Sequence, residues 1–442
     1  MQPNDTICAL ATAPGEGGIA IVRVSGPEAE ALLRALVSPA HGWESHRMYY
    51  GHAVFQGETL DECMAVLFRA PRSYTREDVA EIHLHGGDWT AQSVLSALYR
   101  LGARAAEPGE FTRRAFLNGR IDLSRAEAVM DLISAEGKRA ARAAVRQLDG
   151  GVSAFIRTAQ EELFSLLSGA AAAIDYPEEI TWEEAAAGLE AGARALADKL
   201  DAACDERGAR IARHGLEAVL CGRPNVGKSS LLNALARQEA AIVTDIPGTT
   251  RDVIRADVMI DGLRVRISDT AGLREGSDPI ERIGVSRARR AIAGADVVLA
   301  VFDASRPLTD EDNQLLRDTR DAPRIIVLNQ CDREAVLSPG DFDDPAVVSA
   351  VTGEGIAALE KRIAAFGAGA GESELTQERH MRLARQAAAS LRAAADACAA
   401  GEPVDLAAID LQEALGTLGR ITGDQVDDQL LDEIFSRFCV GK

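Results

Sequence analysis

Residues 222–229, GRPNVGKS, have the spacing of glycine, lysine and hydroxyl residues that binds the phosphates of a nucleotide. They follow a short apolar run, EAVLCG, and precede SLLNALA, so the motif has the strand–loop–helix setting that it requires. Glycine lets backbone N–H groups approach phosphate oxygens, and the start of a helix favours negative charge. We therefore expect Lys228 to reach the β- and γ-phosphates and Ser229 to ligate Mg²⁺.

Two further segments supply groups for a metal-bound triphosphate. DTAG (269–272) ends the run VRISD, and we expect Asp269 to hold the magnesium indirectly and the Gly272 N–H to sense the γ-phosphate. The threonine-rich segment TDIPGTTRD (244–252) can complete the magnesium shell, best with Thr250. Leu273 follows DTAG where Ras-like proteins have the glutamine that orients water, so another group must position the water.

NQCD (329–332) and SAVTG (349–353) indicate the base. Asp332 can accept hydrogen bonds from N1 and N2 of guanine, a donor pair that adenine lacks. The usual motif is NKxD; here Gln330 replaces the lysine, and since glutamine is shorter and uncharged, nucleotide affinity should fall while Asp332 keeps the specificity. The four segments predict a GTP site that includes Gly227, Lys228, Ser229, Ser230, Thr250, Asp269, Gly272, Asn329, Asp332, Ser349 and Ala350.

Apolar patterning divides the chain into parts that could position these residues. Residues 1–118 are expected to be α+β, with strands at 19–26, 48–55, 63–70 and 79–86 and helices at 27–37 and 88–101. Residues 119–214 and 371–442 are alanine-rich with helical spacing, with Asp122 as a candidate N-cap and a break around Tyr176–Pro177. Residues 215–370 alternate short buried strands with helices, which predicts a parallel sheet inserted between the two helical stretches.

Composition limits the classes of protein to which the chain could belong. It has 442 residues, enough for two or three domains, and 47% of them are hydrophobic. No apolar run approaches the roughly 18 residues that span a bilayer, and no secretory signal is apparent, so we expect a cytoplasmic protein. Seven cysteines without a CxxC motif suggest neither a disulfide framework nor a zinc site. The net charge of −20 argues against coating nucleic acid by charge alone.

The whole chain resembles the MnmE/TrmE family of tRNA-modification GTPases. The resemblance rests on NDTICALATAPGEGGIAIVRVSG (4–26), EDVAEIHLHGG (77–87), PGEFTRRAFLNGRIDLSRAEAV (108–129), IDYPEE (174–179), the nucleotide motifs, ERIG (281–284) and the terminal FCVGK. It implies a multidomain fold: an N-terminal α+β folate-binding-like domain, a discontinuous helical domain, and an inserted Ras-like P-loop α/β G domain.

The resemblance also implies a mechanism. The N-terminal domain makes a homodimer, and the G domains pair around a potassium ion that stands in for an arginine finger. Potassium ligands carry over as Asn225, Thr244, Ile246 and Thr249, of which Asn225, Thr244 and Thr249 also count among the nucleotide-binding residues. Glu281 matches the acidic residue that orients water, and with Lys228 it forms the expected catalytic pair. An FAD-dependent partner, MnmG/GidA, would join the chain to add an aminomethyl or carboxymethylaminomethyl group to the wobble uridine of tRNA.

In the family the carbon of that group comes from a folate, such as 5-formyltetrahydrofolate. The resemblance places the folate-binding residues at Arg23, Glu81, Arg120 and Lys442. The family more often has lysine at position 120, and arginine keeps the charge but presents a planar fork. From the residues alone, Arg23 could equally be a surface residue of its strand, and Cys439 could be either a structural thiol or a thiol of the site.

Two other functions share a G domain. A ribosome-assembly GTPase usually carries a basic RNA-binding module, which this acidic chain lacks. A regulatory switch hydrolyses GTP slowly and needs an activator. We therefore expect an enzyme, a GTPase that drives tRNA modification.

Overall fold

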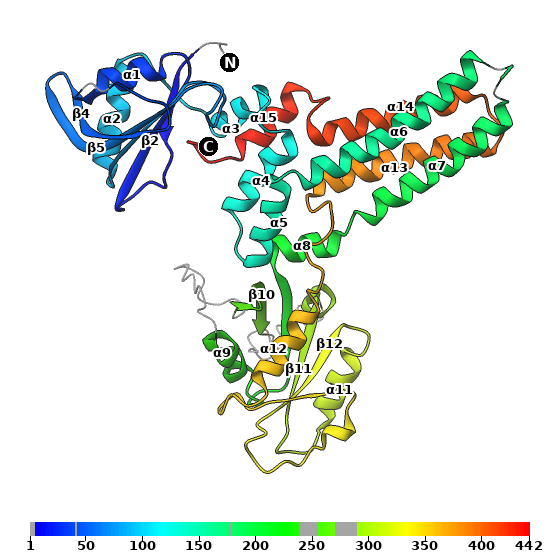
Figure 1. Ribbon diagram of the computed structural model, residues 1–442. Helices are drawn as coiled ribbons and strands as arrows, with labels where there is room; N and C mark the ends of the chain where they lie inside the picture. Colours follow the sequence, from blue (N-terminus) through cyan, green and yellow to red (C-terminus); the bar gives the residue numbers. More distant parts are fainter. Residues whose placement is uncertain (1–4, 40–41, 177, 180, 239–254, 270–289) are drawn as a thin grey trace, which may run out of the picture. The chain divides into compact units, whose positions relative to one another are not determined.

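The computed structural model describes residues 5–39, 42–176, 178–179, 181–238, 255–269 and 290–442. The chain forms two compact units (Figure 1). The first comprises Met1–Met130, Gln147–Leu189 and Ala397–Lys442, and the second comprises Asp131–Arg146 and Glu190–Asp396. Among the described helices, none has the length and apolar character that a bilayer crossing requires. The domain boundaries given above stay predictions.

The first unit contains a seven-stranded sheet in the order β3-β4-β5-β6-β2-β1-β7. All neighbouring strands are antiparallel except β1 and β7. The strands are β1 Ile7–Leu10, β2 Ile19–Ser25, β3 Val37–Ser38, β4 Met48–Phe55, β5 Glu58–Phe68, β6 Val79–His85 and β7 Arg104–Ala105. The four predicted strands are confirmed, whereas the short strands β1, β3 and β7 are too brief to show a period of two.

Two helices, α1 Ala29–Leu36 and α2 Asp88–Arg100, cover one face of this sheet. Their apolar residues recur three and four positions apart, as in Val94, Leu95 and Leu98, so a single face of each helix is buried. These side chains pack against Val22 and Ile82 from the centre of the sheet. The core therefore holds β2 and β6 side by side.

The remaining helices of the first unit include α3 Glu110–Leu117, α4 Leu123–Ile133, α6 Gly151–Asp175, α14 Val404–Thr422 and α15 Asp428–Ser436. The predicted N-cap is confirmed, because Asp122 Oδ1 accepts a hydrogen bond from the Arg125 N–H at 3.0 Å. The predicted break is also confirmed, since α6 ends at Asp175 and α7 (Trp182–Ala202) begins seven residues later.

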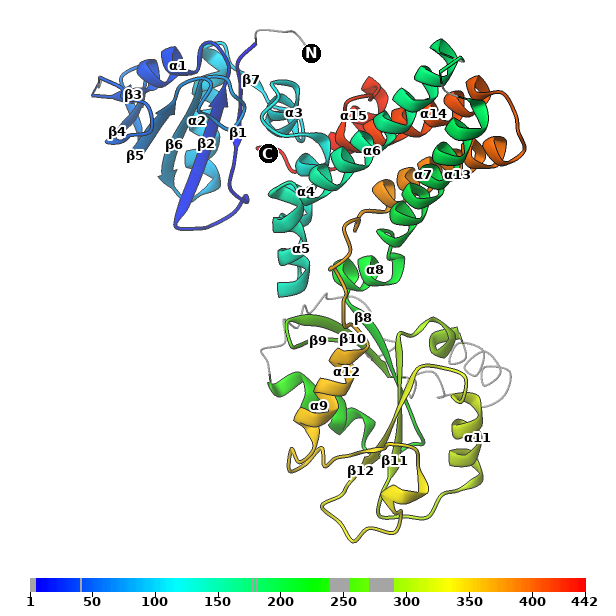
Figure 2. The same cartoon turned by 45° about the vertical axis from the view of Figure 1, so that its right-hand side comes forward.

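The second unit contains a six-stranded sheet in the order β13-β12-β11-β8-β10-β9, parallel except for β9. Its strands are β8 Leu216–Cys221, β9 Arg255–Ile260, β10 Leu263–Asp269, β11 Val297–Asp303, β12 Arg324–Asn329 and β13 Ala346–Val347. Helices α9 Lys228–Gln238 and α12 Ile356–Ala365 cover one face, and α11 Asp310–Asp318 covers the other (Figure 2). Because the parallel strands end at the same edge, the loops that follow them meet there.

The second unit also contains most of α5 Lys138–Leu148, α8 Glu206–His214 and most of α13 Glu378–Ala399. Two arginines of α5 hold the glycine-rich segment that follows α12: Arg139 Nη1 donates to the Gly367 carbonyl at 2.6 Å, and Arg146 Nη2 donates to the Gly371 and Ser373 carbonyls. These bonds satisfy carbonyls that no helix or strand satisfies.

A buried group of charges fixes the start of the first unit. Arg114 on α3 is 6% exposed and its Nη2 lies 2.5 Å from Asp5 Oδ1 and 3.0 Å from Glu110 Oε1, while its Nη1 lies 3.1 Å from Glu77 Oε2. Burial alone would raise the pKa of the Glu110 carboxyl, but hydrogen bonds from Arg104, the Glu107 N–H and Arg114 outweigh it, and the pKa lies below its usual value. Arg114 thus balances three carboxylates from separate segments.

Replacing Arg114 with methionine should lower the free energy of unfolding by about 3–5 kcal/mol, because a buried Glu110 would lose a partner. Arg113→Met is the control, since Arg113 pairs with the largely exposed Asp432 and should lose about 1 kcal/mol or less. Urea unfolding at neutral pH, followed by circular dichroism, measures both. Equal losses in the two variants would contradict this role.

The stability difference between wild type and Arg114→Met should depend on pH. The folded-state pKa of Glu110 lies below its unfolded value, so the stability from this carboxylate is present above the unfolded pKa and is lost as pH falls through the folded pKa. The difference between wild type and Arg114→Met should therefore shrink below about pH 4.

Candidate functional site

The phosphate loop joins β8 to α9 at the carboxyl edge of the second sheet. Glycine is required at two of its positions: a Cβ on Gly222 would lie 2.5 Å from the Val301 carbonyl oxygen, and one on Gly227, at φ +91°, would lie 2.3 Å from Asn329 Nδ2. Leu231 N–H donates to the Gly227 carbonyl at 2.8 Å and so begins the helix. The loop is therefore pressed against β11 and β12 as well as continuing from β8.

Lys228 is buried at the first position of α9, with 5% of its surface exposed. Its Nζ donates to the carbonyls of Gly222 at 3.0 Å and Arg223 at 2.8 Å. These acceptors hold the ammonium inside the curve of the loop. Ser229 and Ser230 follow on the first turn of α9, and both are exposed. The end of the loop thus combines the Lys228 ammonium with a helix N-terminus, and both favour a bound anion.

Asn329 ties the phosphate loop to a second loop. The side chain is 1% exposed at the end of β12; its Nδ2 donates to the Val226 carbonyl at 2.9 Å, and its Oδ1 accepts from the Ala350 N–H at 3.1 Å. Both ends of the carboxamide are used, so the distance between the loops is fixed by a buried polar group.

Asp332 presents a carboxylate beside this link. Ser349 Oγ donates to Asp332 Oδ1 at 2.6 Å and also accepts from the Thr352 N–H at 3.1 Å. The hydrogen bond from Ser349 holds the pKa of the Asp332 carboxyl below its usual value, so the carboxylate stays ionised near neutral pH. An oriented, ionised acceptor suits a pair of N–H donors on one edge of a base.

Gln330 lies between these two groups. It adopts the left-handed backbone region at φ +69°, and its Nε2 lies 3.4 Å from the Asn225 carbonyl oxygen, which it reaches across the phosphate loop. Asn225 is itself left-handed, at φ +65°. The residue that departs from the NKxD pattern therefore touches the phosphate loop directly.

Asp269 completes the described part of the site. It is the last residue of β10, is 2% exposed, and is paired in register with Leu220 of β8, just before the phosphate loop. The other sequence-predicted residues, Thr244, Ile246, Thr249, Thr250, Gly272 and Glu281, lie outside the described residues. The structure brings Asn225, Gly227, Lys228, Asn329, Asp332, Ser349 and Ala350 together at one edge of the sheet.

The phosphate loop makes one contact, between Arg223 and Asp312, that the sequence does not predict. Arg223 Nε lies 3.2 Å from Asp312 Oδ2, and Asp312 is 4% exposed. Asp312 also closes a capping box with Thr309 at the start of α11. The T-x-x-D spacing could have located the cap, but nothing in it indicates the arginine.

A second cluster of predicted residues lies in the first unit. Arg23 on β2 and Glu81 on β6 are paired in register, with Arg23 Nε 2.9 Å from Glu81 Oε1. Arg23 Nη1 also donates to the Gly441 carbonyl at 3.3 Å, although the two residues are 418 positions apart. Burial lowers the pKa of the Lys442 ammonium, the charge of Arg23 lowers it further, and Glu81 opposes both. The chain end therefore lies at this strand pair.

Arg120 joins the cluster through Tyr74, which the sequence analysis missed. Arg120 Nη1 donates to the Tyr74 carbonyl at 3.1 Å, and the guanidinium carbons of Arg120 and Arg23 lie 4.7 Å and 5.3 Å from the centre of the Tyr74 ring. A cavity of about 520 Å³ opens beside them and is lined in part by His46, Tyr74, Glu81 and Arg120. A lone tyrosine in a loop gives no sequence signal of such a role.

Close backbone contact holds the tail in place. Gly441 has φ +94°, and a Cβ there would lie 2.2 Å from the Leu10 carbonyl oxygen. Gly109 N–H donates to the Cys439 carbonyl at 3.4 Å, and Phe438 is buried with Phe435. Cys439 itself is exposed, and Phe438 anchors the segment.

Family models match most of the chain. The MnmE helical domain matches residues 123–439, and the N-terminus of the GTP-binding protein TrmE matches residues 6–120. The chain belongs to the MnmE family.

Several full-length relatives bear the name tRNA modification GTPase MnmE. That of Chloroflexus aurantiacus is 47% identical over 453 residues, which cover 99% of this chain and 100% of the relative. That of Enterococcus faecalis is 45% identical, covering 99% of this chain and 98% of the relative. A crystal structure of Aquifex aeolicus Era bound to GDP and AlF4⁻ is 25% identical in sequence. The match covers 34% of this chain and 56% of the Era chain, with a TM-score of 0.28.

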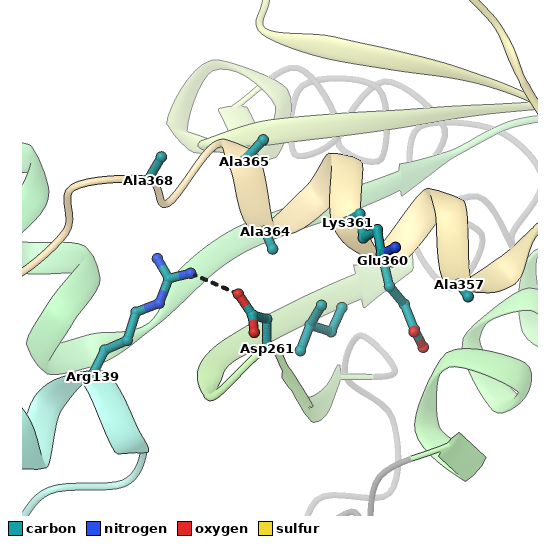
Figure 3. A pocket seen from close by; sticks show the side chains of 9 residues that line it. Arg139, Asp261, Ala357, Glu360, Lys361, Ala364, Ala365 and Ala368 are labelled. Carbon is teal, nitrogen blue, oxygen red and sulfur yellow. Dashed lines mark hydrogen bonds and ion pairs between the residues drawn. The ribbon is translucent and has the colours of Figure 1, made fainter.

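A pocket apart from both clusters lies against α12 (Figure 3). It has a volume of about 520 Å³, and its lining includes alanines of α12 and of the segment after it, together with Ile260, Glu360 and Lys361. Arg139 reaches across it to Asp261, with Nη2 3.3 Å from Oδ2. The described residues of the nucleotide motifs do not line this pocket.

Replacing Gly441 with alanine should displace the tail, because the new methyl group would overlap the Leu10 carbonyl. Gly401→Ala is a matched control: Gly401 is also left-handed, at φ +72°, but a Cβ there meets nothing within 4 Å. We expect Gly441→Ala to make residues 439–442 accessible to carboxypeptidase, with Gly401→Ala resembling wild type. Identical digestion of all three proteins would show that the close contact does not hold the tail.

Proposed function

We propose that the protein is a Mg²⁺-dependent, potassium-activated GTP hydrolase. With an FAD-dependent MnmG/GidA-type partner, it would add an aminomethyl or carboxymethylaminomethyl group to the wobble uridine of tRNA. The observation that supports the GTPase most directly is the convergence of Lys228, Asn329 and Asp332 at one edge of the sheet. The tRNA part rests on the names of relatives that this chain matches over 99% of its length.

In this proposal each described residue has one task. Lys228 turns from two neutral carbonyls to the β- and γ-phosphates, where its charge stabilises the charge that develops during hydrolysis. Asp332 accepts hydrogen bonds from N1 and N2 of guanine, oriented by Ser349. The loop that carries Ala350 would close around the base. Selection of guanine thus depends on a carboxylate that is ionised at neutral pH.

The donors in this region suit Mg²⁺. A buried carboxylate, Asp269, ends the strand next to β8, and the hydroxyl of Ser229 lies on the first turn of α9. Hard oxygen donors and nucleotide phosphates are the usual ligands of this ion. Ser229 and Thr250 would ligate it, Asp269 would hold it indirectly, and the ion would neutralise charge on the phosphates.

The proposal of potassium activation is supported by family membership and by the presence of Asn225 in the phosphate loop. The proposed ligands are the Asn225 side chain and the loop residues Thr244, Ile246 and Thr249. An amide oxygen suits a hard cation, and a cation beside the phosphates adds charge where charge develops. Glu281 would orient the attacking water, because Leu273 has no group to do so. In the family this arrangement forms between the G domains of a homodimer.

A folate is the proposed ligand of the cluster around Arg23, Glu81, Arg120 and Lys442. Two guanidinium groups, an ammonium and a tyrosine ring beside a cavity suit a ligand with aromatic rings and carboxylates. Gly441→Ala should weaken binding of 5-formyltetrahydrofolate measured by calorimetry, whereas GTP hydrolysis should stay near wild type. We place the complex in the cytoplasm.

Asp332→Asn should exchange the preferred base. Asparagine offers one donor and one acceptor, which match the 2-oxo and N1–H groups of xanthine. Loss of an ionic contact to guanine should weaken GTP binding by about 2–3 kcal/mol and favour xanthosine triphosphate. Competition binding with the two nucleotides measures the change. Unchanged GTP affinity would mean that Asp332 does not contact the base.

Hydrolysis should be faster in potassium than in sodium at equal ionic strength. Asn225→Gly keeps the left-handed backbone, removes the side chain, and should abolish the difference. Glu281→Ala should bind GTP normally and lower kcat by about 10²-fold. Equal rates of the wild type in the two salts would refute potassium activation.

A further inference from the structure

Gln330 joins the part of the site that reads the base to the part that holds the phosphates. It comes two residues before Asp332, and its side chain crosses to the phosphate loop, where Nε2 lies 3.4 Å from the Asn225 carbonyl oxygen. A Cβ on Gly227 would lie 3.9 Å from the same nitrogen. A carbonyl accepts only from a donor, so the NH2 end of the amide must face Asn225.

The contact between Gln330 Nε2 and the Asn225 carbonyl is weaker than an ordinary hydrogen bond. At 3.4 Å it is longer than the usual N–H···O bond, and both partners are neutral. The other end of the amide is worse placed, because Gln330 Oε1 is fully buried and has no hydrogen-bond partner among the residues that the structure describes. A buried acceptor without a partner is costly and calls for an explanation.

A lysine at this position would differ in both respects. Its ammonium has three donors and no acceptor, so it would make a charge-assisted bond to a loop carbonyl and leave no oxygen unpaired. It would also bring a positive charge next to a polyanionic ligand. Glutamine therefore gives a looser link between the two loops than the ordinary motif does.

We propose that Gln330 is a positioning residue that sets the lifetime of the bound guanine nucleotide, holding the phosphate loop at Asn225 loosely enough for rapid product release. The inference rests on the proposed GTPase function. The residue acts through the loop, so it changes the rate of dissociation and leaves the choice of base to Asp332.

The test uses two variants of the full chain. Gln330→Met keeps the length and the unbranched stem but removes the amide, and Gln330→Lys restores the ordinary motif. All three residues carry the same Cβ in the left-handed region, so backbone strain is matched. Gln314→Lys is the control for added charge, since Gln314 lies on the exposed side of α11 in the same unit. Thermal melts establish that each variant is folded.

Stopped-flow release of a fluorescent GDP analogue gives the main readout. Gln330→Met should release it about fivefold faster and Gln330→Lys about tenfold slower, with association rates and the preference for GTP over xanthosine triphosphate unchanged. Multiple-turnover hydrolysis by Gln330→Lys should slow as release becomes limiting. Gln314→Lys should release GDP as wild type does.

The outcomes separate the two levels of the proposal. Failure of the wild type to bind the GDP analogue would refute the proposed function itself. If the wild type binds the analogue and both Gln330 variants release it at the wild-type rate, the role of Gln330 is refuted and the proposed function stands. A slower release in Gln314→Lys that equals that of Gln330→Lys would assign the effect to overall charge, and a changed base preference would assign it to Asp332.

Discussion

The site in the second unit depends on one buried side chain, Asn329. The phosphate loop follows β8 and the base-reading residues follow β12 and β13, and the strand order places β11 between β8 and β12. Among the described strands, β8 and β12 are therefore not paired directly with each other. The Asn329 carboxamide spans that gap, with one bond to Val226 and one to Ala350. The Asn329 side chain is itself buried, so a shift of either loop would leave one of its polar atoms unpaired at a cost of about 1–3 kcal/mol.

The sequence predicts the second unit well because its chemistry is local. A phosphate loop needs one strand, one turn and one helix start, all within about fifteen residues, and apolar runs mark the strands that carry it. The first unit is different. The order of its strands, and the short strands β1 and β7 at its edge, depend on pairings that no periodicity marks. Four of its strands are predictable from their own residues, but their neighbours are not.

The cluster around Arg23 shows more clearly which contacts a sequence pattern cannot predict. Arg23 and Glu81 belong to adjacent strands, yet Gly441 is 418 residues from Arg23 and reaches it through tertiary packing alone. Family resemblance named Arg23, Glu81, Arg120 and Lys442, but it did not name Tyr74, whose ring lies near both guanidinium groups. A ring in a loop has no spacing that distinguishes it from a solvent-exposed tyrosine. Only the packed structure shows that the ring lies near both positive charges.

The packing of the last residues of the chain also explains why they are ordered. Terminal residues are normally frayed, because few contacts offset the entropy of ordering them. Here Phe438 is buried against Phe435, and Gly441 approaches the Leu10 carbonyl too closely for any side chain. Gly109 meets the same helix end, where a Cβ would lie 2.6 Å from the Phe435 carbonyl oxygen. The end of the chain is thus ordered by shape, and its ammonium at Lys442 is held at the strand pair by the same contacts that hold the backbone.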